Sequence, residues 1–299
     1  MSFMIYPDVQ NERPKYAYKL TRVGVSDVKK QIFVKRPNKN VTLTVTIDLY
    51  VDLPATKKGA DMSRNVEILS EIVEESIKSP CSSLENLSEE IVKRMLKRHE
   101  YASYAEVTMS ADYFLEKSTY SGRKTVEQYT LLAKANIDKN KNIRKMAGVK
   151  VVGITVCPCA METTRTMLIE QYPEYEEFLN KIPVISHNQR NDTTLLIEVP
   201  GGFEVEADDL IELVENSMSS PTREILKRKD EGLIVLNSHL NPKFVEDVVR
   251  TVLTKVEEKY RGFPGDTLIQ VKSLSEESIH KHNAFAEVIT TLQDLKNQN

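Results

Sequence analysis

The stretch that decides the fold is Val41–Leu53, which reads VTLTVTIDLYVDL. Every odd-numbered residue in it is apolar, and every even-numbered residue is polar or, at Tyr50, tyrosine. Successive side chains of a strand point to opposite faces, so this period of two predicts a strand with one buried face. A sheet with one solvated face is typical of antiparallel pairing.

The same alternation recurs on the C-terminal side of this stretch, and helical patterns lie between. We expect strands over 103–115 and 128–137, and a weaker strand over 18–34. Apolar residues at helical spacing predict two helices between the first and second of the clear strands, with Ser88 as the possible N-cap of the second helix. The residues on these helical stripes are Val66, Leu69, Ile72, Val73 and Ile77, then Ile91, Val92, Met95 and Leu96.

The second half of the chain reads in a similar order. Its expected elements are strands over 145–156 and 193–199, a helix over 207–218, a short helix begun by Ser220-Pro221, a helix begun by Asn241-Pro242, and strands over 266–274 and 283–291. Each half therefore reads β-β-α-α-β-β, although no residue-level repeat is visible. The polar stretch 138–144, DKNKNIR, marks the expected boundary. We predict an α+β protein of two modules, 1–140 and 141–299, with antiparallel sheets and helices on one face.

Composition excludes several classes of protein. The 299 residues are 40% hydrophobic and 28% charged, with a formal net charge of −3, which gives no sign of a nucleic-acid surface. No apolar run approaches the roughly 18 residues of a membrane span, and the N-terminal residues lack the pattern of a signal peptide. Three cysteines do not suggest a disulfide framework. We expect a cytoplasmic protein without membrane or nucleic-acid partners.

Cysteines and histidines of the second half are the first candidates for chemistry. Cys157-Pro158-Cys159 ends a predicted strand, so both sulfurs can face one cavity, although two buried inert thiols explain this pattern equally well. His187 lies in a loop, where most histidines are ordinary surface residues. His280 and His282 share one side of an extended segment, and two exposed polar residues on a strand rim are the simpler explanation. Cys81 lies outside every motif and is expected to be structural.

Taken together, these residue types suit a catalytic metal. A thiolate, an imidazole and a carboxylate supply three ligands and leave a fourth position for water. Such a site makes hydroxide available near neutral pH. Glu231 and Glu246 are candidate carboxylates, although glutamates near helix ends are usually solvated. The sequence has no phosphate-binding loop of the G-x-x-x-x-G-K-[ST] or G-x-G-x-x-G type, so a bound nucleotide must meet lysine or arginine side chains.

Five segments resemble one enzyme family, the type IB GTP cyclohydrolases. The segments are PDVQ at 7–10, VDLPATKKGADMSR at 51–64, GITVCPCA at 153–160, SHNQR at 186–190 and NPKFVED at 241–247. The resemblance covers nearly the whole chain. Within the family the chain is most similar to the archaeal branch, which serves methanopterin synthesis, because of LTRVGV at 20–25 and the long connection between Cys159 and His187.

The resemblance implies a tunnelling fold and a homotetramer with sites at subunit interfaces; unpartnered strand faces also suggest a homo-oligomer, either a dimer or a tetramer. It implies that Cys157, His187 and Glu231 are the metal ligands, with Glu224 as the alternative to Glu231. Glu246 would then bind guanine. The further active-site residues that it implies are Cys159, His280 and His282. The candidates for the phosphates of GTP are Arg190, Arg64 and Lys58, although the last two fit ordinary surface charges as well. Iron(II) is the expected metal, and zinc or manganese would also suit these ligands.

The implied reaction is the hydrolytic opening of the imidazole ring of GTP. Metal-bound hydroxide attacks C8, a histidine shuttles protons, and C8 leaves as formate. The archaeal branch gives 7,8-dihydroneopterin 2′,3′-cyclic phosphate, and the bacterial, folate-pathway branch gives the triphosphate. Two other classes remain open: a tunnelling-fold enzyme that uses a catalytic cysteine without metal, and a metal-binding scaffold without activity.

Overall fold

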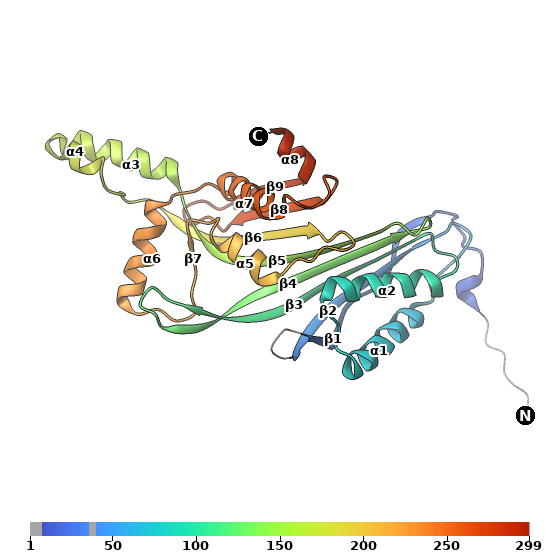
Figure 1. Cartoon of the computed structure of the whole chain (residues 1–299). Coiled ribbons are helices and arrows are strands. Elements are labelled where there is room, and N and C mark those ends of the chain that lie inside the picture. Colours follow the sequence, from blue (N-terminus) through green and yellow to red (C-terminus); the bar gives the residue numbers. More distant parts are fainter. Residues whose placement is uncertain (1–7, 36–39, 299) are drawn as a thin grey trace, which may run out of the picture. The chain divides into compact units, whose positions relative to one another are not determined.

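The computed structural model describes residues 8–35 and 40–298 (Figure 1). Pro7, which belongs to the PDVQ segment, lies outside these residues. The chain forms two compact units, of which unit 1 comprises the residues up to 112 and residues 132–147. Unit 2 comprises residues 113–131 and 148–299.

Unit 1 contains the strand that the alternation predicts. Its strands follow the order β1 (Leu20–Lys35), β2 (Asn40–Leu53), β3 (Tyr104–Ser118), β4 (Lys124–Asp138) and β5 (Ile143–Val156), the last three of which also run into unit 2. β2 pairs antiparallel with both β1 and β3. The odd-numbered residues of β2 from Leu43 to Leu53 are all buried, which confirms the predicted face.

Two helices cover unit 1, after the short 3-10 turn η1 (Val9–Asn11) at its start. α1 (Met62–Lys78) packs against β1 and against α2 (Leu84–Arg98). The predicted N-cap of α2 is wrong: Ser83 caps the helix, and its Oγ accepts a hydrogen bond from the amide of Asn86 at 3.3 Å. Ser88 is instead buried within α2, where its hydroxyl donates to the carbonyl of Glu85.

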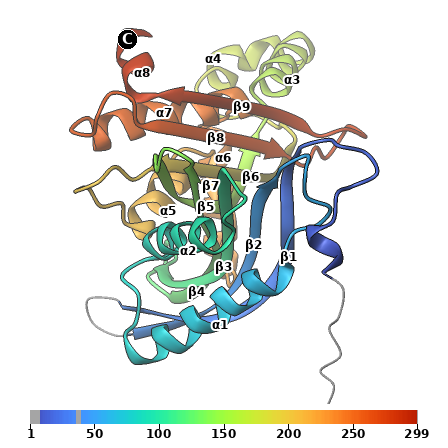
Figure 2. The same ribbon diagram turned by 90° about the vertical axis from the view of Figure 1, so that its right-hand side faces the viewer.

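Unit 2 is built on β5, β6 (Asn188–Glu198), β8 (Leu268–Ser275) and β9 (Ala284–Thr291), in that order. The pairs β6–β8 and β8–β9 are antiparallel. α7 (Val245–Tyr260) packs against β8 and β9 (Figure 2). The other helical elements are α3 (Pro158–Gln171), η2 (Pro173–Tyr175), α4 (Glu176–Leu179), α5 (Ala207–Glu215), α6 (Arg228–Leu240) and α8 (Leu292–Gln298).

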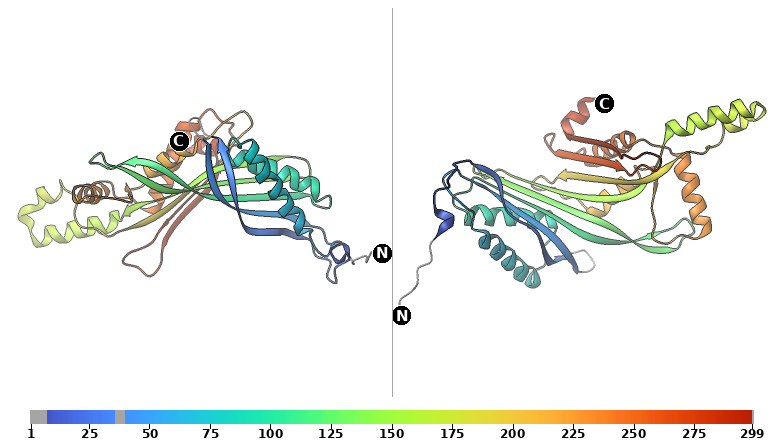
Figure 3. Two further views of the ribbon diagram at one scale, coloured as in Figure 1. Left: turned by 90° about the horizontal axis from the view of Figure 1, so that it is seen from below. Right: turned by 180° about the vertical axis from the view of Figure 1, so that it is seen from behind.

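Two features of unit 2 differ from expectation. Ser220-Pro221 begins no helix; it forms the two-residue strand β7, which pairs antiparallel with β5 at Gly153 and Ile154. The connection between Cys159 and His187 is largely helical, and α3 and α4 project away from the strands of this unit (Figure 3). Met161 is the buried residue of α3, so this helix has no apolar stripe that a sequence pattern would reveal.

The element order agrees with the predicted α+β class and antiparallel pairing. The first half reads β1-β2-α1-α2-β3-β4, and the second half contains β5, β6, α5, α7, β8 and β9 in sequence with further helices inserted. The tunnelling fold and the modules 1–140 and 141–299 remain predictions. Among the helices within the described ranges, none is long and apolar enough to cross a membrane.

Candidate functional site

Unit 2 contains a cavity of about 240 Å³ at the ends of its strands. Segments that are far apart in the chain contribute its walls, which include the end of β5, the start of β6, the start of α7 and the connection from β8 to β9. The lining side chains that can act as acids, bases or ligands are Cys157, His187, Gln189, Lys243, Glu246, Glu277, His280 and His282.

Backbone hydrogen bonds hold Cys157 and His187 next to each other. The amide of Cys157 donates to the carbonyl of His187 at 3.1 Å, and the hydroxyl of Ser186 donates to the carbonyl of Cys157 at 2.6 Å. Cys157 is also the N-cap of α3, and its Sγ accepts a hydrogen bond from the amide of Ala160 at 3.4 Å. Pro158 suits the first position of this helix, where no amide hydrogen is needed. The local sequence therefore fixes the sulfur at a helix N-terminus, which favours negatively charged groups.

The imidazole of His187 faces two polar side chains through its Nδ1 atom. Nδ1 lies 3.1 Å from Oε1 of Gln189 and 3.6 Å from Oε2 of Glu277. The side chains of His187 and Glu277 are only 12% and 9% exposed. Gln189 lies two residues after His187 at the start of β6, so the extended backbone places both side chains on the same side.

His280 and His282 complete a row of three imidazoles. Their rings stack with centroids 5.1 Å apart, and the ring of His280 meets that of His187 edge-on at 6.3 Å. Both residues are exposed, in the connection that leads from β8 into β9. They can therefore exchange protons with solvent and with a molecule in the cavity.

Glu246 lies in the first turn of α7, with its side chain exposed on the cavity wall. The segment before it is anchored to the end of β5, because the amide of Lys243 donates to the carbonyl of Val156 at 3.0 Å. The ammonium of Lys243 donates to the carbonyl of Ser217 at 2.9 Å, and burial lowers the pKa of this lysine. These contacts fix the start of α7 relative to Cys157.

Six of the predicted residues do not line this cavity, namely Glu231, Cys159, Arg190, Arg64, Lys58 and the alternative ligand Glu224. Glu231 is exposed on α6, and Cys159 is exposed at the start of α3. Arg190 is exposed on β6, and its place directly after Gln189 turns it to the other face of the strand. Arg64 belongs to unit 1. The alternative ligand Glu224 is exposed before α6, and its amide donates to Oε2 of Glu127.

The donor types at the cavity fit a divalent metal, since sulfur, imidazole nitrogen and carboxylate oxygen all line it. However, no three Cys, His, Asp or Glu side chains of residues 8–35 and 40–298 already form a cluster that can hold an ion. Cys157 and His187 meet in the cavity, and the third predicted ligand, Glu231, does not. The ligand set therefore remains a prediction.

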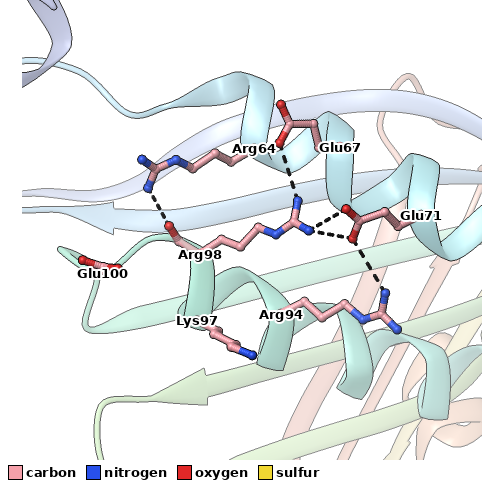
Figure 4. A pocket seen from close by; sticks show the side chains of 7 residues that line it. All are labelled: Arg64, Glu67, Glu71, Arg94, Lys97, Arg98 and Glu100. Atoms are coloured by element: carbon pink, nitrogen blue, oxygen red, sulfur yellow. Dashed lines mark hydrogen bonds and ion pairs between the residues drawn. The ribbon is translucent and has the colours of Figure 1, made fainter.

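Arg64 lines a second, more open cavity, of about 580 Å³, between α1 and α2 in unit 1 (Figure 4). Its guanidinium donates to the carbonyl of Arg98 at 2.6 Å. Nη2 of Arg98 in turn donates to both carboxylate oxygens of Glu71. Nη1 and Nη2 of Arg94 each donate to one carboxylate oxygen of Glu75. These arginines are engaged by carboxylates, and the phosphate-binding role of Arg64 remains a prediction. Lys58 pairs with Glu12 at 2.8 Å.

Three residues that line the cavity, Gln189, Lys243 and Glu277, have no role that the sequence predicts. For two of them the sequence spacing indicates a place near the candidate histidines: Gln189 stands two residues after His187, and Glu277 stands three residues before His280. Lys243 lies inside the NPKFVED segment, where no pattern separates it from a solvated lysine.

Comparison with known proteins shows which family the sequence matches. A family model described as type I GTP cyclohydrolase folE2 matches residues 6–286. The chain is 45% identical to a protein named GTP cyclohydrolase MptA from Methanobrevibacter smithii, over 98% of this chain and 97% of the relative. It is 43% identical to the MptA of Methanosphaera stadtmanae, over 100% and 99%, and 41% identical to that of Methanothermobacter thermautotrophicus, over 99% and 96%.

Solved structures show a related fold at low sequence identity. A hyperthermostable AgUricase mutant matches with a TM-score of 0.51 and 7% identity, over 91% of this chain and 92% of that chain. This similarity concerns the fold alone. The family model matches most of the chain, and the relatives named above align over nearly their whole length. The chain therefore belongs to the type I GTP cyclohydrolase family.

Proposed function

We propose that this chain is a metal-dependent GTP cyclohydrolase of archaeal pterin synthesis. It opens the imidazole ring of the guanine of GTP and releases the C8 carbon as formate. The observation that carries the proposal is the cavity of unit 2, which collects Cys157, His187, Glu246, His280 and His282 from separate segments of the chain. The relatives named GTP cyclohydrolase MptA, aligned over nearly their whole length, support the choice of substrate.

Cys157 and His187 would hold the metal, because they are joined by a backbone hydrogen bond and face the same cavity. A bound divalent metal supplies a water molecule of lowered pKa as the nucleophile for C8. Glu231 remains the proposed third ligand, and its exposed position on α6 suits a contribution from one copy of the chain to the site of another. Iron(II) is the proposed metal, with zinc or manganese as substitutes.

The residues of the cavity provide the remaining functions. The carboxylate of Glu246 accepts hydrogen bonds from the N–H groups of guanine, a pairing that selects this base. His280 and His282 take up and return protons during ring opening, since imidazole titrates near neutral pH. Cys159 and the phosphate contacts of Arg190 and Arg64 belong to the same proposal. They lie outside the cavity of the single chain, which is consistent with a site completed in a homodimer or homotetramer.

The proposed product is 7,8-dihydroneopterin 2′,3′-cyclic phosphate, formed with release of diphosphate in addition to formate, for tetrahydromethanopterin synthesis in the cytoplasm. The alternative is the triphosphate of the bacterial folate pathway. The observation in favour of the cyclic phosphate is the set of relatives named GTP cyclohydrolase MptA, which align over 98% to 100% of the chain.

One experiment tests activity and product together. The protein is purified without oxygen, loaded with iron(II) and incubated with GTP, and formate and the mass of the pterin product are measured. We expect one formate for each GTP consumed and the mass of the cyclic phosphate. The triphosphate mass would replace the archaeal assignment by the bacterial one. Full activity of a metal-free sample would support a cysteine-dependent mechanism instead, and absence of formate would support a metal-binding scaffold.

A further inference from the structure

A buried network of polar side chains lies behind His187. Gln189 stands at its centre: its Nε2 donates to Oγ1 of Thr155 and to Oε1 of Glu277, both at 3.3 Å. Because the amide nitrogen is engaged by these two acceptors, the amide oxygen is directed to Nδ1 of His187, at 3.1 Å. The hydrogen bonds of Gln189 to Thr155 and Glu277 therefore set the orientation of its side-chain amide.

The network continues into the sheet of unit 2 and ties three strands together. Thr155 of β5 meets the hydroxyl of Ser275 at 2.8 Å, and Asn191 of β6 donates to Ser275 at 3.0 Å and to Ser273 at 2.8 Å. Thr193 closes the network by donating to Oδ1 of Asn191 at 2.6 Å. All of these residues are at most 1% exposed. Buried polar side chains that are hydrogen-bonded to one another form a rigid network, and this network fixes the position of Gln189.

Glu277 supplies a second acceptor for the same imidazole nitrogen. Its Oε2 is buried, has no hydrogen-bond partner within the described residues, and is the oxygen that lies 3.6 Å from Nδ1 of His187. A buried carboxylate oxygen without a donor is costly, and the N–H group of His187 is a donor in its vicinity. Two acceptors thus face Nδ1, and the opposite nitrogen, Nε2, is not engaged by either of them.

We propose that Gln189 and Glu277 are positioning residues that accept the Nδ1–H of His187 and thereby present the lone pair of Nε2 to the cavity. The other tautomer would place the lone pair of Nδ1 against two acceptor oxygens, which repel it. The proposal rests on the proposed function, in which His187 is a metal ligand. Partners of this kind fix both the tautomer and the ring orientation of a ligating histidine.

The first test measures the tautomer directly in metal-free protein. Nitrogen-15 is introduced into the histidines, and the ring resonances are recorded at about pH 8, where a histidine of ordinary pKa is neutral. The His187→Gln variant assigns the resonance. We expect wild-type His187 to carry its proton on Nδ1, and we expect Gln189→Ala combined with Glu277→Ala to give a mixture of both tautomers. A wild-type His187 protonated on Nε2 would overturn the proposal.

The second test measures cobalt(II) affinity by the visible absorption of the bound ion. Each of Gln189→Ala and Glu277→Ala should raise the dissociation constant by about 10- to 100-fold. Thr193→Val is the matched control, because it changes the far end of the same network without touching His187. Equal weakening by the control would indicate a general structural role and contradict the proposal.

The two proposals fail in different ways. If the protein forms no formate and binds no cobalt(II), while the resonances of His187 still report the Nδ1–H tautomer and still respond to Gln189→Ala, the proposed function is wrong and the positioning role stands. If formate and metal binding are intact but both variants leave the resonances and the affinity unchanged, the positioning role alone is wrong.

Discussion

His99 is a single buried residue that is expected to make the stability of the protein depend on pH. It is fully buried in unit 1, where Nε2 donates to Oδ1 of Asn65 at 2.7 Å and Nδ1 meets the hydroxyl of Tyr101 at 2.8 Å. Burial lowers the pKa of His99 from 6.5 to about 4, and the nearby charges of Arg64 and Lys57 act in the same direction, against that of Asp61. The native state therefore holds this ring neutral.

We predict that the free energy of unfolding falls by up to about 3 kcal/mol as the pH is lowered from 6.5 to about 4. In this range the unfolded chain binds a proton at His99 and the folded chain does not, so stability is lost as the pH falls. Above 6.5 the ring is neutral in both states, and below 4 it is charged in both. Urea unfolding across this range measures the effect. His99→Gln should show a shallower dependence, and an unchanged slope would contradict the assignment.

Glu246 and Glu231 have different proposed roles, the first in substrate binding and the second in metal binding. Glu246 lines the cavity and Glu231 does not. We predict that Glu246→Ala weakens GTP binding by about 10- to 100-fold while the metal content stays constant, because a charge-assisted hydrogen bond contributes about 1.5–3 kcal/mol. Glu231→Ala should instead lower the metal content. Equilibrium binding of GTP and elemental analysis of both variants measure these effects, and loss of metal from Glu246→Ala would mean that the two roles are exchanged.

Strand β2 shows at the scale of an element how alternation encodes the core. Leu49 is fully buried, and Thr44 on the opposite face is exposed. We predict that Leu49→Ala lowers the free energy of unfolding by about 2–5 kcal/mol, because it leaves a cavity in the core of unit 1. Thr44→Ala should change it by less than about 0.5 kcal/mol. Urea unfolding compares the two, and similar costs would mean that the sheet is not buried on one face.

The elements that the sequence predicted correctly are those with a periodic buried face. The alternation of β2 and the apolar stripe of α7 are local signals, and both elements formed. The predicted start of α7 at Asn241-Pro242 is wrong, however, because Asn241 is the C-cap of α6 and α7 begins at Val245. Ser220-Pro221 has the local signature of a helix start, but its pairing with β5 is a tertiary contact that no local pattern contains. α3 was missed because only Met161 is buried in it. The site followed the same division. The motifs contain Cys157 and His187, which do meet in the cavity, while the contact of Glu277 with His187 joins segments that are 90 residues apart and belongs to no local pattern.

At the scale of the whole molecule, two of the residues proposed for the site lie outside its cavity. Cys157 and His187 share a cavity, whereas Glu231 and Cys159 are exposed outside it. Sequence motifs specify which residues a family uses, but convergence in space depends on packing between distant segments and between copies of the chain. If Glu231 and Cys159 have the roles proposed for them, their exposure leads to the same expectation as the exposed apolar residues, which is a surface that self-association would cover.

Strand β9 is the element on which this expectation can be tested. β9 is the last strand in the order of the sheet, and within the described part of the chain it pairs only with β8. Two of its apolar side chains are exposed, Phe285 to 53% and Ile289 to 61%. An exposed apolar edge strand favours association with another chain. We predict that light scattering finds a dimer or tetramer, and that Ile289→Lys shifts it towards the monomer because a lysine opposes edge pairing. Thr254→Lys, on the exposed surface of α7, is the control and should leave the assembly intact. If sites are shared between copies, formate production should fall in parallel with assembly in the Ile289 variant; a monomer with full activity would show that one chain contains the whole site.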